Sequence, residues 1–394
     1  MWCEDWEKTC HLAAWPESKR LKSAMKEKRR GTKYTMPGLK SEILGKGQPR
    51  TEVREVMDNS FKVLDPETNV EGLRTLIRLH EHLFLLEATG KVLTLMGQGL
   101  EKAGKGSNVT THSLEVSSIR LQVLLGTGRH KELLEELSPF DELDAPDLYF
   151  QYHNSEGPEK EGSMVPYSLR LVHAEALIYS PLPSQAVTRA QRLLIDTQQV
   201  IEDLKAVGSP EEHIHQWEKR LHAAHLLRSR IYYQVGERLS AIESLSELAN
   251  IADEDLKTET NLALSRSLLE QAKKEEAQQH LKDVTDNTTR RVHNAFLSIF
   301  EGESNDVNET MEDVHKQNPD DKMISNNLAV SRVYMGNPLG ASEILLREAR
   351  ESIYMHKPLH PAISINLKTI IELTFPTTVK ASLLKELAAV LPSS

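Results

Sequence analysis

The stretch that comes closest to a catalytic motif runs over residues 99–107. Its Gly99-Leu-Glu-Lys-Ala-Gly104-Lys105 has the spacing of a phosphate-binding loop, in which backbone N–H groups and a lysine hold nucleotide phosphates. That motif needs a Ser or Thr directly after the lysine to hold magnesium, but Gly106 stands there. It also needs a preceding β-strand, whereas residues 92–96 continue a helical pattern. We interpret the stretch as a loop between helices and expect no nucleotide.

The sixteen histidines include close pairs, but none has the pattern of a metal site. Residues two apart on a helix point to different sides. The pairs with that spacing are His80 with His82 and His213 with His215. His222 and His225 share a face, yet no third ligand accompanies them. Since no Gly-x-Ser-x-Gly motif appears either, we expect no catalytic residue, no metal and no cofactor.

The cysteines and the charge distribution narrow the class of protein. Cys3 and Cys10 lie at the start of the chain with only His11 beside them, which gives too few ligands for zinc. A body without cysteines suits a reducing compartment, so we expect a cytoplasmic protein.

Residues 1–50 hold 12 Lys/Arg and 6 Asp/Glu, whereas the remainder of the chain holds 36 Lys/Arg and 52 Asp/Glu. The acidic body argues against a nucleic-acid-binding protein, because phosphate binding needs a positive face.

No segment has the pattern of a membrane anchor. No apolar run approaches the ~20 residues that a transmembrane helix needs. The first residues lack the basic start and apolar stretch of a signal peptide. We expect at most peripheral membrane contact.

Residues 288–350 repeat themselves with a shift of 34 residues. Small or apolar residues recur at fixed offsets, which is typical of the helix-turn-helix units of tetratricopeptide repeats. The matching pairs are Ala295 with Ala329, Gly302 with Gly336, Val307 with Ala341, and Met311 with Leu345. The small residues let the paired helices approach each other, and each Gly ends a first helix.

The repeat continues upstream. The marker position of the second helix reads Ala241, Ala277, Val307 and Ala341, and Ala272 takes the turn position of a degraded copy. The low aromatic content, 5%, suits helices packed through Leu and Ala. We predict an all-α fold: a tetratricopeptide-repeat, right-handed α-solenoid of antiparallel helix hairpins over residues 51–394.

Two regions depart from the repeat. Residues 1–50 form a basic arm that we expect to be mostly disordered or extended, because Gly and Pro interrupt it. Trp2 and Trp6 are four apart, which favours a short helix docked on a partner or on the body as much as a flexible end. Residues 138–163 form an irregular insertion, and its aromatic residues favour a loop packed on the solenoid or on a partner. Those aromatic residues are Tyr149, Phe150 and Tyr152.

A repeat array without a catalytic centre binds other proteins, because stacked units produce an extended surface. Asn327 stands where some repeat proteins place an Asn that hydrogen-bonds a peptide backbone. Asn326 and Asn327 therefore either contact a partner or cap their helix locally. A co-chaperone adaptor that holds an acidic C-terminal peptide is the alternative function, although the Lys and Arg of a carboxylate clamp are not evident in the neighbouring repeats.

Three blocks resemble the subunit 12 family of the trafficking protein particle (TRAPP) complexes. The first is Tyr34-Thr-Met-Pro-Gly-Leu-Lys40. The second runs from Ser138 to Tyr152 and on through Gly162-Ser-Met-Val-Pro-Tyr-Ser-Leu-Arg-Leu-Val-His-Ala-Glu175. The third comprises Asn326-Asn-Leu-Ala-Val-Ser331 and Asn366-Leu-Lys-Thr-Ile-Ile-Glu-Leu373. The likeness covers roughly residues 33–394, and the long acidic, Pro-rich N-terminal region of animal members is missing or reduced to the arm.

The resemblance implies a non-catalytic scaffold of the TRAPPIII form. In that assembly the core activates a Rab GTPase by nucleotide exchange. The resemblance implies that this chain joins the large subunits, chiefly 8 and 11, to that core, with only an indirect link to the GTPase. It also implies a place at the ER–Golgi intermediate compartment and Golgi, in vesicle transport and autophagy.

Overall fold

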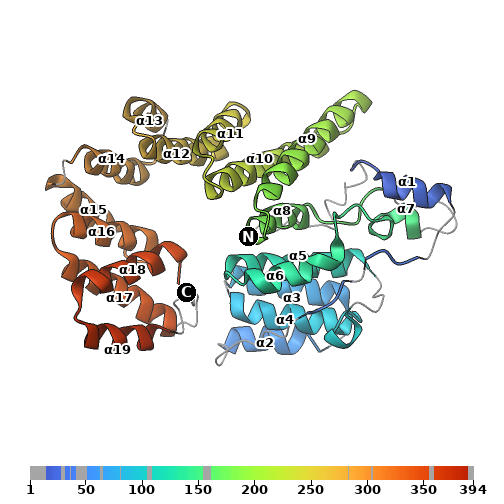
Figure 1. Cartoon of the computed structure of the whole chain (residues 1–394), viewed down its shortest axis with the longest axis horizontal. Helices are drawn as coiled ribbons and strands as arrows, with labels where there is room; N and C mark the ends of the chain where they lie inside the picture. The colour runs from blue at the N-terminus through green and yellow to red at the C-terminus, as the bar shows by residue number, and fades with distance from the viewer. Residues whose placement is uncertain are drawn as a thin grey trace. The chain divides into compact units, whose positions relative to one another are not determined.

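The computed structural model describes residues 15–27, 32–35, 37–40, 51–62, 65–79, 81–103, 109–153, 161–282, 284–302, 305–354 and 359–388. The chain divides into two compact units, residues 1–248 and 249–394. Within the described residues the architecture is all-helical apart from one isolated antiparallel bridge between Tyr149 and Ser163 (Figure 1). This confirms the predicted fold class of packed helix hairpins.

The first unit contains helices α1 to α11. They are α1 (Lys19–Lys26), α2 (Thr51–Ser60), α3 (Pro66–Arg78), α4 (His82–Leu95), α5 (Thr111–Gly126), α6 (His130–Leu137), α7 (Phe150–His153), α8 (Tyr167–Ala176), α9 (Ser184–Val207), α10 (Glu211–Gln234) and α11 (Arg238–Ile251), with short 3-10 turns η2 (Leu100–Lys102), η3 (Ser138–Phe140), η4 (Pro146–Leu148) and η5 (Leu177–Tyr179). The last residues of α11 already belong to the second unit.

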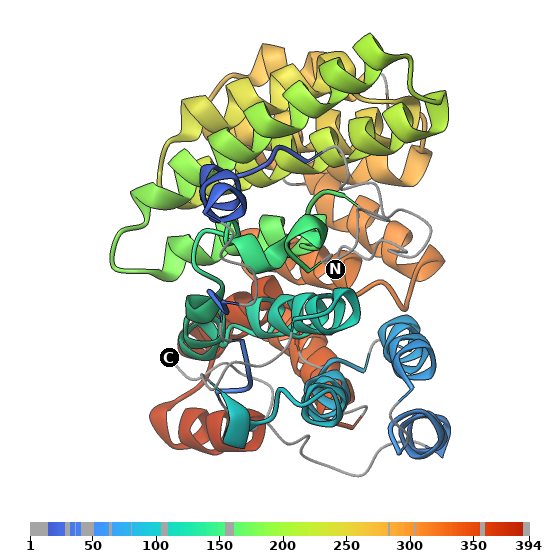
Figure 2. The same ribbon diagram turned by 90° about the vertical axis from the view of Figure 1, so that its right-hand side faces the viewer.

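Consecutive helices α2 to α6 pack pairwise, and α8 packs against α5 and α9. Local signals start these helices as expected. The Asp65 carboxylate accepts from the Glu67 N–H ahead of α3, and Pro66 takes the first position, where a missing N–H costs nothing. Thr110 and Ser113 form a capping box at α5. The two longest helices, α9 and α10, lie side by side along their length (Figure 2).

The second unit contains α12 (Glu254–Glu270), α13 (Lys274–Leu281), α14 (Asn287–Glu301), α15 (Asn305–Gln317), α16 (Lys322–Tyr334), α17 (Pro338–Tyr354), α18 (Pro361–Thr374) and α19 (Thr377–Leu387). Each helix from α14 to α17 packs on its successor, as stacked hairpins require, and α19 packs on α17. None of the described helices is both long and apolar enough to cross a bilayer.

The structure confirms the predicted repeat register. The eight paired positions behave as expected: the alanines, valine, methionine and leucine are buried, and both glycines end their helices in the left-handed region. Gly302 has φ 77° and Gly336 has φ 74°. Ala272 adopts the same conformation with φ 58°, so the degraded copy keeps the turn although it lacks the glycine that favours it. The marker alanines Ala241 and Ala277 are also buried.

The arm differs from the expectation of disorder wherever the structure describes it. Ser18 caps α1 by accepting from the Leu21 N–H, and Leu21 and Ala24 are buried on the first unit. The helix lies beside the segment that contains η4 and α7 (Figure 1). Helical spacing within the basic stretch places its few apolar residues on one side, which gives the arm a face to bury.

Candidate partner-binding surfaces

The arm meets the irregular segment through the Asp147 carboxylate. Asp147 follows Pro146 in η4, so a short 3-10 turn sets its direction. Its Oδ2 accepts from the backbone N–H groups of Tyr34, at 2.9 Å, and Thr35, at 2.8 Å. It also accepts from the Thr35 hydroxyl at 2.9 Å. Thr35 and Asp147 are both buried, and hydrogen bonds to an ionised group are stronger than those between neutral groups.

A second contact joins α1 to the acidic loop 141–144. Arg20 donates to the Asp141 carboxylate at 2.7 Å and to the Asp144 carboxylate at 2.9 Å. The Ser18 hydroxyl donates to the Asp144 carbonyl at 2.6 Å while it caps α1. These contacts fix both the position and the direction of the helix.

The loop that receives Arg20 is also held from its other side. His173 on α8 lies with Nε2 2.6 Å from the Asp141 carbonyl, which can only accept a hydrogen bond, so this nitrogen is protonated. Burial, reinforced by Arg189, lowers the pKa of His173 to about 3 and keeps the ring neutral. Asp141 has φ 51° and Leu143 has φ 60°, conformations that non-glycine residues adopt only when their surroundings impose them.

A third contact buries Trp15. Its ring stacks on Trp217 of α10 with centroids 6.1 Å apart and an interplanar angle of 16°. Tyr167 meets it edge-on at 6.4 Å, and the Arg170 guanidinium lies 4.1 Å from its centroid. The indole is therefore enclosed by aromatic and cation–π contacts.

The predicted aromatic cluster lies under the arm. Tyr149 donates its hydroxyl to the Pro16 carbonyl at 3.2 Å, and Tyr152 donates to the Thr32 carbonyl at 2.8 Å. Both rings are buried, and burial raises the pKa of each phenol, so both remain donors. Phe150 is half-buried against the core of the first unit. Of the two settings that we predicted for this loop, the structure shows packing on the chain itself.

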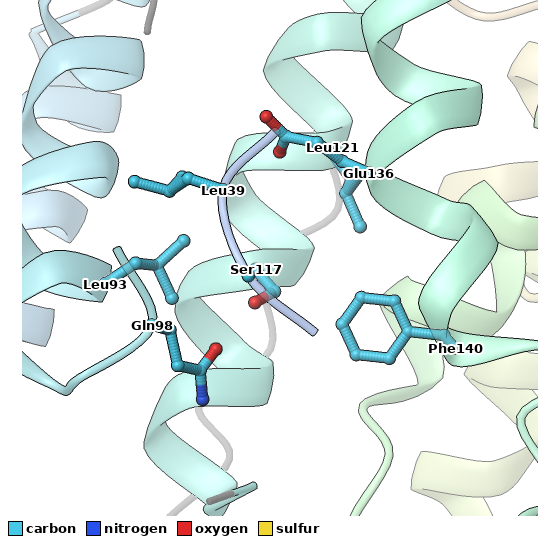
Figure 3. A pocket seen from close by; sticks show the side chains of 8 residues that line it. Leu39, Leu93, Gln98, Ser117, Leu121, Glu136 and Phe140 are labelled. Atoms are coloured by element: carbon cyan, nitrogen blue, oxygen red, sulfur yellow. The ribbon is translucent and has the colours of Figure 1, made fainter. Parts of the chain in front are cut away.

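Leu39 lies between Leu93 of α4 and Glu136 of α6 (Figure 3). The Leu39 N–H donates to the Gln98 carbonyl at 3.1 Å, and a Cβ on Gly38 would lie 2.8 Å from the Ala103 Cα. A cavity of about 10 Å³ beside them has room for one water at most, so it is no cofactor pocket. Its lining includes Glu136, whose carboxylate forms a buried ion pair with Arg120 at 2.9 Å.

We call the whole region that receives the arm the arm-binding surface. It comprises Asp141, Asp144, Asp147, Tyr149, Tyr152, Tyr167, Arg170 and Trp217. Our sequence-based selection of binding residues included Tyr149 and Tyr152 but missed Asp147, Arg170 and Trp217. The sequence does contain one indication of this surface: Asp141, Asp144 and Asp147 recur every three residues, and their negative charge complements the basic arm.

In the second unit, Asn326 and Asn327 have different surroundings. Asn326 is buried, and its Oδ1 accepts from Asn366 Nδ2 at 2.9 Å, so it joins α16 to α18. Asn327 is half-buried. The structure thus places Asn326 within the helix packing rather than on an open face.

The same unit exposes three apolar side chains at related positions of its helices. Phe300 and Tyr334 are related by the 34-residue shift. A shift of 39 residues superposes the buried Ser325 and Leu328 on Ser364 and Leu367, and it carries Tyr334 onto Leu373. These last-turn residues of α14, α16 and α18 are exposed by 46%, 64% and 64%. Because stacked repeats align equivalent positions along one face, we define Phe300, Tyr334 and Leu373 as the apolar row.

The remaining positions singled out from the sequence lie in a short turn or outside the described residues. Residues 100–102 form the turn η2, and the rest of the phosphate-loop-like stretch up to residue 108 lies largely outside what the structure describes. Trp2, Trp6, Cys3 and Cys10 also lie outside it. No group of three or more His, Cys, Asp or Glu residues within the described part has a metal-site arrangement.

Comparison with known proteins gives the chain two curated relatives and no matching protein-family model. It is 25% identical over 393 residues to trafficking protein particle complex subunit 12 of Mus musculus, covering 90% of this chain and 48% of that protein. It is 25% identical over 332 residues to the same-named protein of Homo sapiens, covering 78% and 44%. The chain is homologous to subunit 12 and spans about half the length of these relatives.

Solved structures with helical repeats also align with the chain. A tetratricopeptide repeat protein from Parabacteroides merdae matches 70% of this chain and 98% of its own, with 12% identity and a TM-score of 0.34. A chain of an APC/C hetero-tetramer matches 81% of this chain and 59% of its own, with 13% identity and a TM-score of 0.28. The fold assignment therefore rests on the helices of this chain.

Proposed function

We propose that the chain is a non-catalytic scaffold subunit of a TRAPP complex. The observation that carries this proposal is the homology to subunit 12, which covers 90% of the chain. The described residues add packed hairpins with exposed apolar side chains, an arrangement that suits protein binding.

In its finer form, the proposal concerns the TRAPPIII assembly. There the chain would join the large subunits, chiefly 8 and 11, to the core that carries out nucleotide exchange on a Rab GTPase. It would act in the cytoplasm, peripheral at the ER–Golgi intermediate compartment and Golgi, in ER-to-Golgi transport and autophagy. The chain itself would contribute no exchange activity.

We propose the apolar row as one of the scaffold's contacts, with the apolar face of a partner helix as its ligand. Aromatic residues at the centre of an interface commonly contribute ~2 kcal/mol or more each to binding. Phe300, Tyr334 and Leu373 repeat at the interval of the hairpins, and a partner helix laid across them meets one apolar side chain per repeat.

Affinity purification of the tagged full chain from cells of its own species tests the proposal. Mass spectrometry should recover the other TRAPP subunits, large and core. Reproducible recovery of none of them would refute the scaffold function. A second comparison, between variants of the chain, tests whether the apolar row carries the contact.

This comparison uses the double variant Tyr334→Ser, Leu373→Ser. We expect recovery of at least one subunit to fall about tenfold or more, which corresponds to ~1.4 kcal/mol. The matched control is Tyr354→Ser, at an 82%-exposed residue outside the row, and it should leave recovery unchanged. Equal recovery for the row variant and the control would assign the contact to another surface.

A further inference from the structure

The arm fits its binding surface incompletely. Among the described residues, three buried polar atoms at the points of contact have no hydrogen-bond partner: Asp147 Oδ1, Arg170 Nε and Trp217 Nε1. All three side chains belong to residues that are more than nine-tenths buried. Asp147 lies under Thr35, and the other two enclose Trp15. Native proteins leave few such atoms, and each requires a reason.

Arg170 shows the mismatch most clearly. Its Nη2 donates to the Ser163 hydroxyl at 2.7 Å, and its guanidinium faces the Trp15 ring. Within the described residues no carboxylate oxygen lies within ion-pair distance of it. Burial lowers the pKa of Arg170 to about 10, opposed in part by Tyr149 and Asp196. A buried guanidinium without an anion is unusual, because nothing compensates for its lost hydration.

One of the contacts that hold the arm, the Arg20 ion pair, is partly solvated, whereas Leu21, Thr35 and Leu39 are buried. Arg20 and its partner Asp141 are 39% and 59% exposed, and exposed ion pairs add little to stability. The arm binds because it is tethered, which gives it a high effective concentration.

We propose that the arm-binding surface is a contact site for a segment of another TRAPP subunit, and that the arm occupies it as a replaceable ligand. The partner segment is extended. It carries one carboxylate, which accepts from Arg170 Nε in place of the Trp15 ring. It carries one basic side chain for Asp141 and Asp144, and it directs an N–H or hydroxyl at Asp147 Oδ1. This inference rests on the proposed function.

The experiment compares variants of the full chain that have opposite expected effects. The double variant Arg20→Ala, Thr35→Val weakens the binding of the arm to the arm-binding surface and leaves that surface unchanged. Recovery of the partner subunit should therefore rise three- to tenfold. Arg170→Met removes the cation that the partner pairs, so recovery should fall at least tenfold while the melting temperature stays unchanged or rises. Lys19→Ala, on the exposed side of α1, is the matched control and should change neither quantity.

A purely structural role makes a different prediction. If the arm only stabilises the first unit, then the arm variant and Arg170→Met both lower the melting temperature, and neither raises recovery. That result would overturn the proposal. So would unchanged recovery with Arg170→Met.

A binding measurement separates this inference from the scaffold function. A labelled peptide of residues 15–40 should bind the Arg20→Ala, Thr35→Val chain saturably. It should bind the unaltered chain at least tenfold more weakly, because its own arm occupies the surface, and adding Asp147→Asn should abolish binding. Absence of saturable binding would show that the arm is not a replaceable ligand, whether or not TRAPP subunits co-purify.

Discussion

The docked arm of the first unit and the repeats of the second unit are held by different kinds of contact. The repeats pack through apolar residues that recur every 34 positions, so each contact is close in sequence and the pattern is visible in the chain. The arm is held by hydrogen bonds, ion pairs and a stacked indole that join residues more than 110 positions apart. The repeats are held by apolar packing between neighbours in sequence, whereas the arm adds long-range directional contacts to the burial of Leu21 and Leu39.

The largest expected effect concerns the repeats. Ala341→Glu buries a charge between α16 and α17, and we expect it to lower the free energy of unfolding by about 4 kcal/mol or more, because the carboxylate loses its hydration without a partner. Urea unfolding measures the change. Leu339→Glu, at a position 54% exposed on the same helix, is the control and should cost little. A similar cost for both would refute the repeat register.

Next in size is the buried ion pair of the first unit. Glu136→Gln leaves the Arg120 guanidinium buried without its counter-charge, and breaking such a pair typically costs ~3–5 kcal/mol. The same unfolding measurement applies. The surface pair Lys91–Glu87 gives the matched control, since Glu87→Gln should cost ~1 kcal/mol at most. Equal effects would mean that burial does not distinguish the two pairs.

The buried histidines give the first unit a pH dependence. The folded-state pKa is about 3 for His173 and about 4 for His225, with burial as the main cause, and both lie below the unfolded value near 6.5. The neutral rings therefore contribute stability that is fully present above pH 6.5 and is lost as the pH falls towards 4. From pH 7 to pH 5 we expect a loss of about 2 kcal/mol per histidine.

Denaturant unfolding at pH 7, 6 and 5 checks this slope. His173→Gln should remove roughly half of the pH dependence, because Gln can still donate to the Asp141 carbonyl but does not titrate. An unchanged slope in this variant would show that His173 is not held neutral.

The smallest expected effect tests how closely the arm fits. Gly38→Ala brings a Cβ to 2.8 Å from the Ala103 backbone, so we expect the arm to loosen at a cost of about 1 kcal/mol or more. Faster proteolytic cleavage within residues 15–40 measures it. Gly126→Ala has open space around it and lies at the end of a helix, so it should be neutral or slightly stabilising. If both variants leave cleavage unchanged, the contact at Gly38 does not hold the arm.

Much of the fold could be predicted from the sequence because its determinants are local. The 34-residue shift identified Ala295, Ala329 and Ala341 as packing positions, and all three are buried. The candidate site was predicted only in part. Tyr149 and Tyr152 were selected for their aromatic clustering, but their role under the arm depends on residues 16 and 32, which the order of the chain does not connect to them.

The sequence by itself determined the class of helices, the spacing of the hairpins and their packing faces, because helical periodicity and small residues act over one or two turns. Only the tertiary structure decided that Asp147 receives Tyr34 and Thr35, that Trp15 stacks on Trp217, and that Arg170 is buried without a carboxylate. A hydrogen bond or a stacked ring requires atoms in one place, and folding alone brings distant residues there.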